Sequence, residues 1–179
     1  MAPASSQLSR LTAQPGGDFV VFRIGLRINS YWKIHQWLPV ARMMIPMLKE
    51  LYSHPELGFL GAELHIGLRH IFHIQYWRSY EQLMAYSHSK DHAHLPAWRE
   101  YNRRYRATNA VGIFHETYRV RAGEQESIYV NMPPYGLGLV TGVVEATGRR
   151  QSARGRMSLT DGQDSPVPAY GEIAPVEAR

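Results

Sequence analysis

Side chains that could do chemistry gather in one stretch of the chain. Residues 73–104 hold four histidines, two tryptophans and an asparagine. Imidazole titrates near neutral pH, so histidines in such a cluster suit proton transfer or coordination of a metal or heme. We therefore expect a site here, with His73 and His94 as candidate catalytic bases.

Other residues are expected to complete this site, either by stabilising a negative charge on the substrate or by forming flat apolar walls. Arg27 is predicted to be catalytic, because a guanidinium can hold an oxyanion formed when a base removes a proton from the substrate. Amide, basic and aromatic side chains are expected to bind the substrate. These candidate substrate-binding residues are Arg23, Asn29, Gln75, Trp77, Trp98, Asn102 and His115.

A metal centre is not predicted, although three histidines lie close together in the sequence. On one helix, His88 and His92 would share a face, but His94 would not. Asp91 is the only nearby carboxylate, and the chain has no cysteine that could supply thiolate ligands.

Hydrophobic periodicity predicts the elements that must position these side chains. Alternation of apolar and polar residues indicates strands, and apolar residues at helical spacing followed by Pro or Gly indicate helices. Ser79 followed by Gln82 predicts a helix start after the third strand. The expected strands are 19–29, two between 59 and 77, 111–120 and 126–131, and the expected helices are 39–52, one from Ser79 and 96–106.

The resulting β-α-β-β-α-β-β order predicts an α+β fold, a ferredoxin-like antiparallel sheet with both helices on one face. Alternation assigns Phe22, Ile24, Leu26, Phe72, Ile74 and Tyr76 to the helix-facing side of the sheet. The other side would then carry Arg23, Arg27, Asn29, His73, Gln75 and Trp77. That second side is either solvated or, if two subunits pack these faces into a barrel, the lining of a cavity.

Composition places the chain among ordinary globular proteins. Of 179 residues, 44% are hydrophobic and 20% charged, and no apolar run is long enough to span a membrane. The net charge of +5 comes largely from scattered arginines, so we expect no nucleic-acid partner. The expected organisation is a flexible arm over 1–17, one domain over 18–138 and a flexible tail over 139–179, in a cytoplasmic protein.

Seven segments of the chain resemble a known family. They are GLRIN, KIHQWLPVARMM, HPELGFLG, IQYWRSYEQL, HLPAWREYNRR, VGIFHETY and IYVNMPPYGLG, which fall between Phe19 and Gly138. They resemble the dimeric α/β-barrel superfamily of antibiotic-biosynthesis-monooxygenase-like proteins, in particular a subgroup similar to the monooxygenase of the fungal fumagillin pathway.

This resemblance implies a homodimeric, monooxygenase-like oxidoreductase of secondary metabolism that acts on a hydrophobic small molecule without a cofactor. The implied substrates are aromatic, polyketide or terpenoid. Heme-binding relatives, which degrade heme or dehydrate aldoximes, leave a second interpretation open. In it Asn29, Trp77 or Trp98, and His92 or His94 would contact heme, with His94 as the iron ligand. A non-catalytic module that binds a small ligand is a third interpretation.

Overall fold

The computed structural model describes residues 10–157, which divide into two compact units. One unit is Phe19–Arg119. The other comprises the described segments 10–18 and 120–157. No helix in the described part of the chain is both long and apolar enough to cross a membrane.

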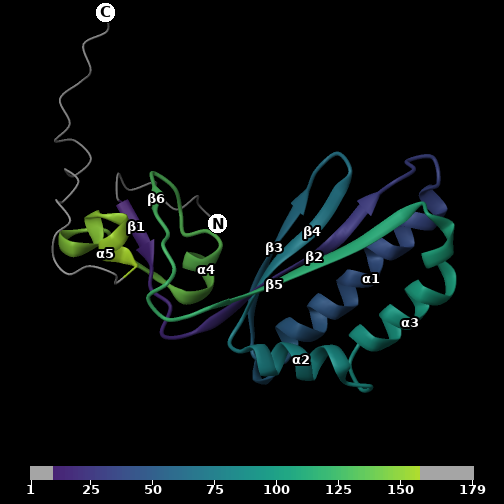
Figure 1. The fold of residues 1–179 in the computed structure, drawn as a ribbon, viewed down its shortest axis with the longest axis horizontal. Helices are drawn as coiled ribbons and strands as arrows, with labels where there is room; N and C mark the ends of the chain where they lie inside the picture. Colours follow the sequence, from purple (N-terminus) through teal and green to yellow (C-terminus); the bar gives the residue numbers. More distant parts are fainter. Residues whose placement is uncertain (1–9, 158–179) are drawn as a thin grey trace, which may run out of the picture. The chain divides into compact units, whose positions relative to one another are not determined.

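The unit Phe19–Arg119 contains a four-stranded sheet with helices on one face (Figure 1). Its sheet order is β3-β4-β2-β5, which is the strand order of a ferredoxin-like β-α-β-β-α-β fold and confirms the predicted class. Its elements are β2 (Phe19–Ile28), α1 (Ile34–Ser53), η1 (Pro55–Leu57), β3 (Phe59–Ile66), β4 (His70–Trp77), α2 (Tyr80–His88), α3 (His94–Arg104), η2 (Arg106–Thr108) and β5 (Val111–Val120).

Local signals in the sequence explain where two of the helices begin. The Ser79 side chain accepts a hydrogen bond from the Gln82 backbone N–H at 3.1 Å, so Ser79 is the predicted N-cap of α2. Helix α1 begins five residues before the predicted start at Pro39 and contains both Pro39 and Pro46. Each proline removes one backbone hydrogen bond from α1, a loss that the packing of its buried face offsets.

The register between β2 and β4 corrects the predicted faces of the sheet. Directly opposite residues of an antiparallel pair share a face, and His73 lies opposite Ile24. The predicted helix-facing side was right for β2 and wrong for β4. The β4 residues on the helix-facing side are His73, Gln75 and Trp77, and those on the other side are Phe72, Ile74 and Tyr76.

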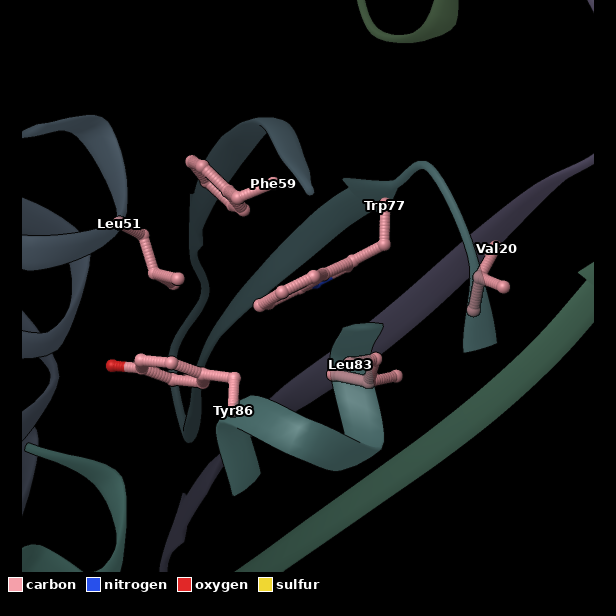
Figure 2. Packing of buried hydrophobic residues seen from close by; sticks show 6 residues of the cluster. All are labelled: Val20, Leu51, Phe59, Trp77, Leu83 and Tyr86. Atoms are coloured by element: carbon pink, nitrogen blue, oxygen red, sulfur yellow. The ribbon is translucent and has the colours of Figure 1, made fainter. Parts of the chain in front are cut away.

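Trp77 is the centre of the core between the sheet and the helices. It is completely buried and lies between Phe59 of β3 and Tyr86 of α2, with ring centroids 5.5 and 5.7 Å away (Figure 2). Leu83 of α2 and Leu51 of α1 belong to the same buried cluster. The core therefore uses the β4 face that the sequence had assigned to a separate cavity.

The second unit is built on a three-stranded sheet of order β6-β1-β7. Its strands are β1 (Arg10–Ala13), β6 (Tyr129–Val130) and β7 (Val143–Glu145), and its helical segments are α4 (Leu137–Thr141), η3 (Gly148–Gln151) and α5 (Ala153–Arg156). The last predicted strand, 126–131, was expected beside the main sheet. Its residues 129–130 pair instead with β1.

Regular structure thus extends into the segments for which the sequence predicted a flexible arm and a flexible tail. A four-residue strand such as β1 is too short to show an alternating pattern, and its partners are far away in the sequence. Residues 120–138, expected in the main domain, group with β1. The remainder of the arm and tail, 1–9 and 158–179, lies outside the described residues.

Candidate functional site

A cavity of about 460 Å³ lies within the unit Phe19–Arg119, between the sheet and the three helices. Strands β2, β4 and β5 form its floor, and α1, α2 and α3 form its walls. Four of the seven methionines of the chain line it, namely Met43, Met44, Met47 and Met84. No Asp, Glu, Lys or Arg is among its lining residues. The cavity thus suits an apolar molecule, since thioether side chains adapt to irregular apolar shapes.

Histidines provide most of the polar groups of this cavity. His73 comes from β4, His88 from the end of α2, His94 from the start of α3 and His115 from β5. Elements distant in sequence therefore bring together His73, His94 and His115, three of the residues that the sequence had singled out. His88, which is exposed, also borders the cavity.

The imidazole of His73 is buried. Its residue is only 8% exposed, and no group in the described part of the chain hydrogen-bonds to its ring. Burial lowers the pKa of His73 below 6.5, and the charge of nearby His65 lowers it further. A neutral imidazole in this position has one N–H and one lone pair to offer to a bound molecule.

The protonation of His94 follows from its one hydrogen bond. Its Nδ1 lies 2.9 Å from the backbone carbonyl oxygen of Ser87. A carbonyl oxygen can only accept, so Nδ1 carries the proton and, in the neutral ring, Nε2 carries the lone pair. Burial lowers the pKa of His94, and the charges of His88 and His115 lower it further against the opposing effect of the Ser87 hydrogen bond. His94 is therefore suited to accept a proton or to bind a metal through Nε2.

Aromatic rings form part of the cavity wall near His94. Trp98 of α3 is 46% exposed, lines the cavity and stacks on Tyr101 with a centroid distance of 5.8 Å. Phe22 of β2 contacts His115, whose ring centroid is 5.8 Å away. Of the two tryptophans predicted to bind the substrate, Trp98 is therefore the one that lines the cavity.

The remaining predicted residues lie elsewhere. Trp77 and Gln75 are in the core, where the Trp77 indole N–H donates to the Gln75 side-chain oxygen at 3.0 Å. Asn102 lies on α3 and donates to the Trp98 carbonyl oxygen at 2.9 Å, outside the cavity lining. Asn29, at the end of β2, donates to the Asn109 carbonyl oxygen at 3.3 Å.

The predicted roles of Arg23 and Arg27 are not supported, because both lie on the sheet face away from the helices. Arg27 is exposed and donates to the side-chain oxygen of Asn29. Arg23 donates to Glu116 at 3.1 Å, and its guanidinium lies over the rings of Phe72 and Phe114. The sequence analysis assigned both arginines to the same sheet face as His73. The register between β2 and β4 places His73 on the opposite face.

A carboxylate that the sequence analysis did not single out links the loop before His94 to α1. Glu50 of α1 accepts hydrogen bonds from the Tyr86 hydroxyl at 2.9 Å and from His92 Nδ1 and the Ala93 backbone N–H at 3.0 Å each. Burial alone would raise the pKa of Glu50, but these three hydrogen bonds lower it. The only signal in the sequence is a glutamate at a partly buried position of a helix. The partners of Glu50 are 36 to 43 residues away, so no local pattern indicates them.

Two histidines of the His88, His92 and His94 cluster have separate hydrogen-bond partners. His92 bonds to Glu50, and His94 bonds to Ser87. Within residues 10–157, no group of three or more His, Asp or Glu side chains is placed to hold a metal ion.

A second apolar groove lies on the other side of α1, against β3 and β4. It is open to solvent, has a volume of about 630 Å³ and shares His73, Ile71, Ala41 and Met44 with the first cavity. His73 therefore lies in the wall between the two hollows.

Comparison with known proteins identifies relatives of this chain. "Monooxygenase af470" of Aspergillus fumigatus is 26% identical over 163 residues, which are 86% of this chain and 57% of that protein. The chain therefore spans little more than half the length of this curated relative.

Two solved structures share part of the architecture. One is a dimeric protein of unknown function with a ferredoxin-like fold from Bacteroides fragilis, 8% identical, with a TM-score of 0.40 over 56% of this chain and 96% of that one. The other is a candidate antibiotic biosynthesis monooxygenase from Chloroflexus aurantiacus, 15% identical, with a TM-score of 0.39 over 66% of this chain and 99% of that one.

The family match covers the sheet, the helices and the cavity together. Residues 19–137 match the family described as "Monooxygenase af470-like", and every residue that lines the cavity falls within this range. Since the match extends over most of the 179 residues, this chain belongs to the Monooxygenase af470-like family.

Proposed function

We propose that this chain is a monooxygenase of secondary metabolism that oxidises an apolar small molecule in the cavity between the sheet and the helices. The substrate class is aromatic, polyketide or terpenoid, with an acidic C–H or O–H group. The observation that carries the proposal is the pairing of a methionine-rich lining without Asp, Glu, Lys or Arg with the lone pair of His94 Nε2. Membership of a family named for a monooxygenase supports it.

In the proposed reaction His94 is the base. Its Nε2 removes a proton from a methylene carbon conjugated with a carbonyl group, or from the O–H of the enol or phenol tautomer, and the resulting anion shares its charge between the oxygen and that carbon. The N–H of neutral His73 donates a hydrogen bond to the oxyanion, a role that the sequence analysis had predicted for Arg27. His115 and Trp98 are proposed to contact the substrate at the cavity wall.

Dioxygen is the oxidant in this scheme. A methylene carbon that has lost its proton gives an electron pair to dioxygen, and a C–O bond forms. The O–O bond of the resulting peroxide then breaks as the carbon loses its second hydrogen. One oxygen atom stays on the carbon as a carbonyl and the other leaves as water, so the substrate supplies all the electrons that dioxygen accepts. Exclusion of water by the apolar lining protects the carbanion from reprotonation.

A homodimer is part of the proposal. The sheet face away from the helices carries Arg23 paired with Glu116, together with the aromatic rings of Phe72 and Phe114. We propose that this face packs against the same face of a second copy, as the resemblance to dimeric barrels implies. The cytoplasmic location expected from the composition stays a prediction.

Heme binding is the second candidate function, and one observation favours it. The His94 Nδ1–H bond to a backbone carbonyl orients and polarises the ring as it does for metal-bound histidines. The donor atom therefore fits iron. Heme also carries two carboxylates, and the cavity lining contains no Lys or Arg to pair with them. The residues present thus fit the iron but not the rest of the group.

An anthrone tests the proposed reaction, because its methylene carbon becomes a carbanion after loss of one proton. The purified chain should consume dioxygen with the anthrone and insert one atom of isotopically labelled oxygen, whereas a His94→Ala variant should match the background without protein. An anthrone that is bound but recovered unchanged would point to a ligand-binding module. A Soret shift with hemin in the wild-type chain, absent from His94→Ala, would support the heme alternative.

A further inference from the structure

Two loops meet at one end of the sheet in the unit Phe19–Arg119. The first follows β2, and the second is the turn between β3 and β4 (Figure 1). Because β2 and β4 are antiparallel, the end of β2 lies beside the start of β4, and the Ile28 backbone N–H donates to the Arg69 carbonyl oxygen at 2.7 Å. These loops carry the most exposed large apolar side chains of the described residues.

Trp32 is 93% exposed and Leu68 is 91% exposed. Ile66, at 72%, and Ile34, at 53%, flank them, and Tyr31 is exposed as well. We call these five residues, Tyr31, Trp32, Ile34, Ile66 and Leu68, the loop patch. Single exposed apolar residues are common on proteins, but a group that contains an almost fully exposed Trp and Leu marks an interaction surface.

The two loops are held in place by contacts between them. The Tyr31 hydroxyl donates to the Leu68 carbonyl oxygen. The Arg69 guanidinium lies 4.8 Å from the Tyr31 ring centroid and donates to the carbonyl oxygens of Ile28 at 3.1 Å and Asn29 at 3.3 Å. Trp32 follows Tyr31 and Leu68 precedes Arg69 in the sequence. These two exposed side chains therefore project from loops that contacts of Tyr31 and Arg69 hold together.

The charged residues of the two loops all have one sign. Arg27, Lys33 and Arg69 are exposed, and the segments 27–35 and 64–70 contain no Asp or Glu. The nearest acidic residue in sequence, Glu63, is already bonded to Tyr76 at 3.2 Å. A projecting apolar tip with a basic border is the arrangement by which peripheral proteins insert into a bilayer that carries anionic headgroups.

We propose that the loop patch docks this protein on the surface of an anionic lipid bilayer, with Trp32 and Leu68 inserted at the level of the headgroups. A second copy of the chain fits this surface less well, because a symmetric contact would bring the same three cations of both copies together without an acidic partner. The loop patch lines neither the cavity nor the groove, so this proposal is independent of the reaction.

Vesicle flotation tests the proposal. The full chain should float with phosphatidylcholine vesicles that contain phosphatidylserine, less with phosphatidylcholine alone, and less as the salt concentration rises. The double variant Trp32→Ser with Leu68→Ser should reduce binding by more than about tenfold. Lys33→Gln should reduce it by about fivefold, since each nearby cation adds modestly to attraction by anionic lipid. Leu139→Ser is the matched control, because Leu139 is 66% exposed in the other unit.

A second measurement does not depend on the folding of the double variant. Bromine-labelled lipids should quench part of the tryptophan fluorescence of the wild-type chain, and this fraction should disappear in Trp32→Phe. Three results would overturn the proposal: no flotation at low salt, flotation unchanged in the double variant, or quenching unchanged in Trp32→Phe. A change of oligomeric state in the double variant without any lipid binding would assign the loop patch to contacts between copies instead.

Discussion

The Nδ1–H of His94 donates to the Ser87 carbonyl oxygen at 2.9 Å, and this bond fixes which ring nitrogen has a lone pair. Ser87 belongs to the last turn of α2, and His94 is the first residue of α3. The break between the two helices therefore orients the base of the proposed reaction.

Replacement of His94 by Ala should lower kcat/KM for oxygen consumption with the anthrone by about 10²- to 10⁴-fold, the range typical of a lost general base. His70→Ala is the control, because His70 is exposed and pairs opposite Arg27 on the other sheet face. Both variants should keep the wild-type melting temperature within a few degrees. Equal losses of activity in the two variants would argue against His94 as the base.

The pH dependence of the reaction should follow the lowered pKa of His94 and of His73. Both pKa values are lower than the ordinary 6.5, so protonation of the rings, and with it the decline of kcat/KM, should occur at lower pH than for an exposed histidine. The unfolded chain binds protons near pH 6.5 while these buried rings do not, so the free energy of unfolding should also fall below pH 6.5. A rate profile with its acidic limb above pH 6.5 would contradict this assignment.

The tryptophans Trp77 and Trp98 should respond differently to substitution. Trp77→Ala should cost about 3 to 5 kcal/mol of unfolding free energy, because the ring is completely buried in the core. Trp98→Ala should change stability little, since the ring is 46% exposed, but should raise KM for the anthrone by about threefold to tenfold. Urea unfolding and steady-state kinetics measure the two effects. A larger loss of stability in Trp98→Ala than in Trp77→Ala would be inconsistent with these positions.

Glu50→Gln should lower the free energy of unfolding by about 1 to 3 kcal/mol, because an amide cannot accept all three hydrogen bonds of the carboxylate. The pKa of Glu50 is below its ordinary 4.5, so its stabilising contribution is present above pH 4.5 and is lost as the pH falls through the folded value. Urea unfolding at several pH values should therefore show a weaker acid dependence in the variant. Glu81→Gln, an exposed change in the first turn of α2, should cost less than about 1 kcal/mol.

Charge reversal at Glu116 tests the proposed dimer. Glu116→Arg removes the partner of Arg23 and places like charges on the sheet face away from the helices. Because the pair is exposed in the single chain, the fold should tolerate the change, whereas a dimer formed through this face should dissociate. Analytical ultracentrifugation at several protein concentrations would show the shift. A dimer of unchanged affinity would exclude this face as the interface.

The sequence by itself determined most of the elements of the main sheet. Alternation located β5 at Val111–Val120, and the Ser79 cap located the start of α2, because these signals depend only on neighbouring residues. The histidine-rich segment also contained two of the cavity residues expected to be catalytic, His73 and His94. Periodicity shows which residues of a strand share a face, and for β4 the predicted grouping into two faces is confirmed.

Only the tertiary structure decided which face of β4 lies inside. Both of its faces carry aromatic and polar side chains, so composition could not distinguish them, and the pairing of His73 with Ile24 settled the choice. That pairing placed Trp77 in the core and separated Arg23 and Arg27 from His73. The network around Glu50 and the pairing of β1 with β7 likewise depend on contacts between distant residues, which no local pattern of the sequence records.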